Sequence, residues 1–263
     1  MIKKESVNMK IVKFKKDKSN TYKVYFDDGI EIILYDDVII KYNLLIEKEF
    51  DNNKFNEITN YNSYLDGYYK AIKYINKKMR SEIEVVKYLE KYNIDKKNIV
   101  DIIELLYKDG YLNDEIYVKA YINDQYNLSS NGPLKVKKDL IKLGYDNILY
   151  EEYLNTLDWN KKINRLIDKK IKLNHKLSNN SLKEKIVNDI IKLGFDKEDI
   201  LLYLDSIYLE DDYELLVNEL NKILKKYKLK YKDEELKYKV INYLYKKGFN
   251  IEDIKRCYDE NIL

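Results

Sequence analysis

The stretch IKLGYDN at residues 141–147 decides the fold, and it recurs about fifty residues later as IKLGFDK at residues 191–197. Each copy is a short apolar segment followed by glycine, an aromatic residue and aspartate. Glycine adopts the left-handed backbone that ends many helices without steric cost. Aspartate caps the start of a helix by accepting a backbone N–H. The stretch therefore predicts a tight joint between two helices, used more than once.

Two further copies of this joint emerge when the chain is aligned on Gly144 and Gly194. Asn93 and Gly248 then occupy the glycine position, which we call the slot, so the period is about fifty residues. The residue four before the slot is apolar, the next after it is aromatic or isoleucine, and the second after it is Asp or Asn. The apolar columns fall on one helical face. The alignment predicts four copies of one unit.

Each unit has room for a further helix upstream of the joint, giving three helices per copy. The first is predicted from about Tyr61 to Lys78, and capping-box patterns occur at Ser81 with Glu84 and at Ser181 with Glu184. Other predicted helix starts lie near Asp114, Pro133, Asp146, Asp158, Asp196, Asp211, Asp233 and Asn250. Because a unit of this size buries little by itself, we expect the units to stack into an elongated, curved array.

The N-terminal part of the chain has a different pattern. Lys10–Phe14, Thr21–Phe26 and Ile30–Tyr35 are rich in β-branched and aromatic residues, which favours strands. Asp28-Gly29 between the last two is a hairpin turn signal. Asp36–Leu44 is predicted to be a short helix capped by an aspartate. These features indicate a small β-rich module.

The predicted fold class is therefore mainly α, with about four tandem three-helix repeats after the β-rich module. Seven glycines and one proline in 263 residues agree with a helix-rich chain. We predict the module at residues 1–48 and the repeats at residues 49–112, 113–157, 158–209 and 210–263.

Composition excludes several classes of function. The 49 basic and 46 acidic residues give a net charge of +3, unlike a strongly basic nucleic-acid binder. Cys257 and His175 are single residues of their types, too few for a disulfide framework or a zinc site. We interpret Cys257 as a packed apolar residue and His175 as a solvated loop residue. No phosphate-binding glycine motif or catalytic constellation is present, so we expect a protein that is not an enzyme and has no cofactor.

The chain has no apolar run of 18 residues and no signal-peptide pattern at its start. We therefore expect a cytoplasmic protein without a membrane partner. Because an array of repeats has two different ends, we expect a monomer.

Three short segments within about residues 65–160 match a known pattern, both in their residues and in the distances between them along the chain. They are Arg80–Glu82 with Glu84, Gly110–Glu115 with Tyr117 and Ala120, and Gly132–Leu134 with Leu140–Gly144. These segments resemble the RSE-x-E, GYLDDERYA and GP…KG patterns of the RecX regulatory proteins. The later units and the β-rich N-terminus fit the longer members of that family.

The resemblance implies a regulator of the RecA recombinase. Members of the family are built from tandem three-helix repeats, bind RecA filaments on single-stranded DNA, and suppress ATP hydrolysis and strand exchange. The expected partners are therefore the RecA filament and single-stranded DNA. The chain departs from the family in having lysine where many members have arginine, and lysine is weaker at bidentate recognition of phosphate or carboxylate.

Basic residues gather where such a filament would be contacted. We predict partner or DNA binding by Lys77, Lys78, Arg80, Lys135, Lys137, Lys138, Lys142, Lys161, Lys162 and Arg165. The alternative is that these residues are solvated helix faces neutralised by acidic neighbours. A third basic group follows at residues 222–232.

Two other functions stay open at this point. The chain could bind single-stranded nucleic acid directly through its lysine faces, without RecA, or it could be a helical scaffold for another partner. We interpret Trp159 as a core or inter-repeat anchor in preference to a base-stacking platform.

Overall fold

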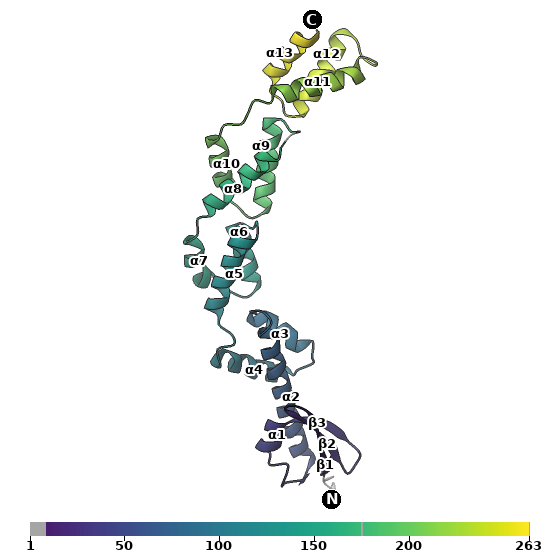
Figure 1. Cartoon of the computed structure of the whole chain (residues 1–263), viewed down its shortest axis with the longest axis vertical. Helices are drawn as coiled ribbons and strands as arrows, with labels where there is room; N and C mark the ends of the chain where they lie inside the picture. The colour runs from purple at the N-terminus through teal and green to yellow at the C-terminus, as the bar shows by residue number, and fades with distance from the viewer. Residues whose placement is uncertain (1–8, 175, 263) are drawn as a thin grey trace, which may run out of the picture. The chain divides into compact units, whose positions relative to one another are not determined.

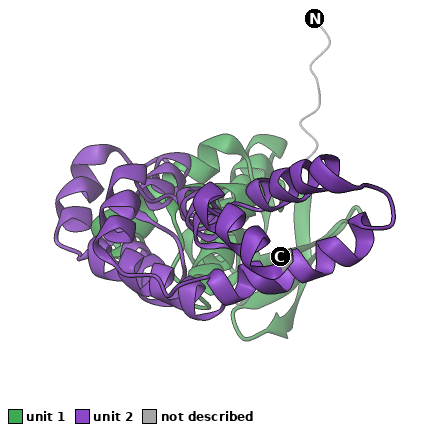
Figure 2. Cartoon of the chain, turned by 90° about the horizontal axis from the view of Figure 1, so that it is seen from above, with its two compact units in different colours: residues 1–117 green, residues 118–263 purple. Residues whose placement is uncertain are grey.

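The computed structural model of the protein describes residues 9–174 and 176–262. These residues form thirteen helices and one small sheet (Figure 1). Contacts divide the chain into two compact units, with the division between Tyr117 and Val118 (Figure 2). The prediction of a mainly helical chain with a β-rich N-terminal module is confirmed.

The N-terminal sheet is antiparallel, with strand order β3-β2-β1-β4. Its strands are β1 (Met9–Lys18), β2 (Thr21–Phe26), β3 (Glu31–Tyr35) and β4 (Glu49–Phe50). The turn between β2 and β3 is the predicted one, because Gly29 has a φ of 88° and the Phe26 N–H donates to the Ile30 carbonyl.

One face of the sheet packs on helices α1 (Asp36–Lys41) and α2 (Asn52–Ile75) through a buried apolar cluster. The predicted aspartate cap of α1 is wrong. The N-cap position is Tyr35, whose side chain makes no cap bond, and Asp36 already lies in the first turn. An acidic first turn still suits the positive end of the helix dipole.

Helix α2 begins nine residues before the predicted start at Tyr61. Asp51 caps it by accepting the N–H of Lys54. Polar residues dominate its first turns, so no apolar stripe marked them. Ile58 in this half packs on the sheet, whereas Ala71 in the other half packs on α3 and α4. One helix therefore belongs to both the β-rich module and the first three-helix group.

The remaining helices form three-helix groups. The first group adds α3 (Glu82–Glu90) and α4 (Lys96–Lys108) to α2. The second contains α5 (Asp114–Leu128), α6 (Pro133–Lys142) and α7 (Asn147–Asn155). The third contains α8 (Trp159–Lys172), α9 (Asn179–Lys192) and α10 (Lys197–Ser206). The fourth contains α11 (Tyr213–Tyr227), α12 (Asp233–Lys246) and α13 (Ile251–Ile262). The residue boundaries predicted for the domains stay a prediction.

The slot residues have the predicted left-handed backbone in all four copies. Their φ values are 56°, 88°, 89° and 85° at Asn93, Gly144, Gly194 and Gly248. In each copy the N–H of the residue after the slot donates to the carbonyl of the residue four before the slot. These bonds are Ile94 to Leu89, Tyr145 to Leu140, Phe195 to Ile190 and Phe249 to Leu244. This is the Schellman ending of a helix, and the residues it joins are buried in every copy.

Aspartate side chains cap the helices that follow the joints, as at Asp95, Asp146 and Asp196. The capping box of Ser81 and Glu84 is confirmed. The cap predicted at Ser181 is wrong, since α9 begins three residues earlier with Ser178 as its N-cap. Ser181 instead donates its hydroxyl to the carbonyl of Lys247, in the fourth group.

The slot glycines also allow close approach between successive groups. The N–H groups of Gly132 and Leu134, at the start of α6, donate to the carbonyls of Leu193 and Gly194 at 2.7 and 3.0 Å. A Cβ atom at Gly194 would lie 2.5 Å from the backbone nitrogen of Lys135. The free donors of one helix start thus satisfy the free acceptors of another helix end. Gly248 makes a similar joint, where Ser178 and Ser181 both donate to the Lys247 carbonyl.

We expect Gly194→Ala to destabilise the protein more than Gly29→Ala. The φ values are alike, 89° and 88°, but nothing lies within 4 Å of a Cβ at Gly29. The left-handed backbone alone costs about 1–2 kcal/mol with a side chain, and the clash at Gly194 adds about 1–3 kcal/mol. Urea unfolding of both variants measures the difference. Equal losses of stability would show that the close approach contributes nothing.

Candidate functional site

The cations at the end of α2 differ in how they are held. Lys77 and Lys78 are exposed in the turn after the helix. The Arg80 guanidinium lies 3.1 Å from the Glu84 carboxylate and stacks 4.0 Å from the centre of the Tyr74 ring. Burial opposes ionisation of Glu84, but the Ser81 N–H and the Arg80 guanidinium prevail and lower the pKa of that carboxyl. Arg80 therefore stabilises the start of α3.

On α6 the predicted lysines divide in the same way. Lys137 reaches Glu151 of α7 at 2.6 Å, and Lys142 pairs with Asp139 at 3.0 Å. Lys138 is exposed and makes no ion pair with the described residues. Lys135 is half-buried because its backbone and Cβ lie against the Gly194 joint.

Lys162 of α8 points inward. Its ammonium donates to the carbonyls of Gln125 and Asn131 at 2.7 and 3.0 Å. The centres of the Tyr126 and Trp159 rings each lie 5.3 Å from the nitrogen of this ammonium group. Burial lowers the pKa of Lys162 to about 8. This lysine ties the third group to the end of α5 in the second group.

Lys161 and Arg165 lie one turn apart on α8 and are exposed, without an ion pair to any described residue. Helical spacing brings these two predicted residues together, whereas Lys138 is on another helix. We call Lys138, Lys161 and Arg165 the outward cations.

Trp159 contacts both of the groups that it joins. Its indole N–H donates to the Leu154 carbonyl at 2.9 Å, and its ring meets Tyr126 and Phe195 edge-on. These contacts support the interpretation of Trp159 as an inter-repeat anchor.

Cys257 packs in the buried cluster of the fourth group, as predicted, and burial raises the pKa of its thiol. His175 lies outside the described residues.

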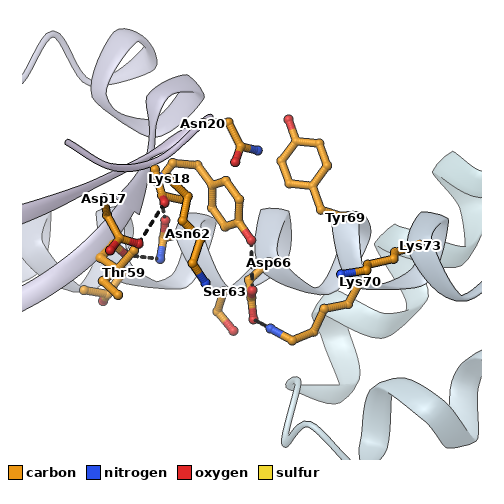
Figure 3. Close-up of a pocket in the computed structure, with 13 residues that line it drawn as sticks. Asp17, Lys18, Asn20, Thr59, Asn62, Ser63, Asp66, Tyr69, Lys70 and Lys73 are labelled. Atoms are coloured by element: carbon orange, nitrogen blue, oxygen red, sulfur yellow. Dashed lines mark hydrogen bonds and ion pairs between the residues drawn. The ribbon is translucent and has the colours of Figure 1, made fainter.

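A cavity of about 780 Å³ between the sheet and α2 was not foreseen (Figure 3). Its polar groups pair with one another: Tyr35 donates its hydroxyl to Asp66, which also pairs with Lys70. Asn62 bonds the backbone of β3 at both Tyr35 and Ile33. These residues come from segments far apart in the chain, so the sequence signals only the one-turn spacing of Asn62, Asp66 and Lys70. Because these polar groups bond one another, they hold the sheet of the β-rich module on α2.

The chain resembles regulatory proteins over most of its length. It is 34% identical to the regulatory protein RecX of Lactococcus lactis subsp. lactis, over 87% of this chain and 88% of that one. It is 30% identical to the regulatory protein RecX of Streptococcus agalactiae serotype Ia, over 96% of this chain and 99% of that one. The chain belongs to the RecX family.

The RecX family model that describes the third three-helix domain matches residues 210–258, the C-terminal group of helices. Two solved structures are also similar. A crystal structure of regulatory protein RecX aligns with a TM-score of 0.62 at 18% identity, covering 75% of this chain and 99% of that chain. The crystal structure of RecX from Lactobacillus salivarius aligns with a TM-score of 0.50 at 26% identity, covering 55% and 98%. The first likeness shows the fold.

RecX relatives are named as regulatory proteins and not as enzymes, which supports a regulatory role for this chain. Within residues 9–174 and 176–262, no group of three or more His, Cys, Asp or Glu residues is placed to hold a metal ion. No helix in the described part of the chain is both long and apolar enough to cross a bilayer.

We expect Lys162→Met to remove a pH dependence of stability that Lys161→Met leaves in place. The folded pKa of Lys162, about 8, lies below the ordinary value of 10.5. Between these values the folded chain has released the proton and the unfolded chain still binds it. The contribution of Lys162 to the free energy of unfolding therefore rises with pH in this window.

Urea unfolding from about pH 7 to about pH 9.5, below the ordinary titration of tyrosine, measures this effect. The stability of the wild type relative to Lys162→Met should increase across the range. A constant or falling difference would contradict the inward placement of the ammonium.

Proposed function

We propose that this chain binds RecA filaments assembled on single-stranded DNA and lowers their ATPase and strand-exchange activity. The observation that carries the proposal is the similarity to RecX regulatory proteins along almost the whole chain. On this proposal the chain acts in homologous recombination and DNA repair, as a monomer in the cytoplasm.

The geometry separates the ten predicted residues into those that position helices and those that are exposed for binding. Arg80, Lys137 and Lys162 are held by neighbouring groups, so they position the helices, whereas Lys142 is exposed and pairs only with Asp139 on its own helix. The outward cations are free to approach phosphate. A cation that neutralises a phosphate releases a condensed counterion, which favours binding at low salt. Lys77, Lys78 and Lys135 stay in the proposed surface as further contacts.

One observation favours the second candidate, direct binding of single-stranded DNA. Lys161, Arg165, Lys169 and Lys172 are all exposed on α8 and follow one another at intervals of three or four residues. Residues at that spacing share one helical face. Such a row of cations would follow a phosphate backbone even without a recombinase.

The test of the proposed function is the ATPase rate of RecA on single-stranded DNA while this protein is titrated in. We expect the rate to fall as the protein approaches the concentration of RecA, because bound regulator blocks filament growth. An unchanged rate at equal concentrations would overturn the proposal. Tight, salt-dependent binding to DNA in the absence of RecA would favour the second candidate.

We expect the triple variant Lys138→Glu, Lys161→Glu and Arg165→Glu to bind the filament about tenfold or more weakly at low salt. The matched control reverses Lys225, Lys226 and Lys230, which are exposed in the fourth group and carry the same total charge. Fluorescence anisotropy of labelled filaments at two salt concentrations measures both variants. Equal weakening by the two would mean that net charge matters and the position of the outward cations does not.

A further inference from the structure

A groove of about 590 Å³ lies between α3 and α4 in the first three-helix group (helices labelled in Figure 1). Val86, Ile99 and Ile103 form its floor, and Val100 is an apolar residue with 56% of its surface exposed. Contact between an apolar surface and water is unfavourable, and an exposed apolar patch in a groove is therefore typical of a binding surface.

The edge of this groove is acidic. Glu82 and Glu90 line it from α3, and Glu104 lines it from α4, against one cation, Lys96. Within the described residues none of the three carboxylates has an ion pair; Glu82 accepts a hydrogen bond from the Tyr107 hydroxyl at 3.0 Å.

In the second and fourth groups an ion pair joins the two helices that correspond to α3 and α4, at a different position in each group. In the second group Lys137 and Glu151, seven residues before and after the slot, pair at 2.6 Å. In the fourth group Lys237 and Asp259, eleven before and after the slot, pair at 2.9 Å. Both pairs join the second helix of the group to the third.

Among the described residues the first group forms neither pair. The third group also has an apolar pair at the first of these positions, Val187 and Leu201, whereas two glutamates at the second are found in the first group alone. Counted from Asn93, Val86 and Val100 stand where the second group has its pair, and Glu82 and Glu104 stand where the fourth group has its own. Two valines leave the apolar floor uncovered, and two glutamates put like charges on opposite sides of it. Like charges are unfavourable unless a cation comes between them. Opposed glutamates over an apolar floor do not help to fold the group, so they favour an occupant that brings cations.

We propose that the groove binds a protein segment with apolar side chains flanked by lysine or arginine. The apolar side chains would cover the floor, and the cations would neutralise Glu82, Glu90 and Glu104. Nucleic acid does not fit this chemistry, because the carboxylates repel phosphate. Resting on the proposed function, the segment belongs to a recombinase subunit, while the outward cations face DNA.

Three variants of the full chain test this assignment. Glu104→Lys reverses one edge charge, and Asp101→Lys makes the same change on the same helix outside the groove. The double variant Val86→Lys, Val100→Glu closes the groove with the pair that the second group already forms. The probes are RecA filaments on a single-stranded oligonucleotide and that oligonucleotide alone.

We expect Glu104→Lys and the double variant to bind the filament about tenfold more weakly, as for the loss of a central interface contact. Asp101→Lys should stay within about twofold of the wild type. Binding of the oligonucleotide alone should be unchanged or tighter for Glu104→Lys.

Wild-type affinity for the filament in both groove variants would overturn the assignment and leave the proposed function standing. Tighter filament binding by Glu104→Lys would show that the groove faces nucleic acid, which also overturns it. Failure of the wild type to bind the filament would overturn the proposed function, and this assignment with it. Thermal unfolding checks that each variant is folded, and Glu104→Lys, at an exposed position, remains informative if the double variant is not.

Discussion

The structure depends on the pairing of helix ends at the slot glycines. At each joint a helix ends with a left-handed residue, and its last carbonyls need donors. At the end of α9 the carbonyls of Leu193 and Gly194 accept from the N–H groups of Gly132 and Leu134, which lie about sixty residues earlier at the start of α6. Because backbone meets backbone, there is no space for a Cβ atom. The same glycine thus ends one helix and joins two groups.

The joints explain why charged residues that look alike in the sequence have different roles. Where two groups are drawn together, a nearby cation becomes part of the contact, as Lys162 does on the carbonyls of Gln125 and Asn131. Lys161, its neighbour on the same helix, is exposed. Adjacent positions on a helix point in different directions, so a cluster of lysines contains both supports and binding groups.

Because the three-helix groups repeat, the same helix positions can be compared from one group to the next. The second and fourth groups each join their second and third helices by an ion pair, at positions that differ between the two groups. The first group instead has Glu82 opposite Glu104, which no other group has at those positions, whereas its valines Val86 and Val100 correspond to Val187 and Leu201 of the third group. Both glutamates are exposed and lie outside the buried core of the group, so they bear on recognition more than on stability.

The sequence by itself determined the helix joints, most of the caps and the hairpin at Gly29, because each depends on hydrogen bonds between residues no more than about six apart. It did not determine where α2 begins, that Ser181 bonds Lys247 and is not an N-cap, or which lysines are held. The start of α2 depends on a local cap, Asp51 on Lys54, in a stretch too polar to show an apolar stripe. The other two features depend on partners far along the chain, 66 residues away for Ser181 and 37 for Lys162 with Gln125. Only the tertiary structure brings such partners within hydrogen-bonding distance.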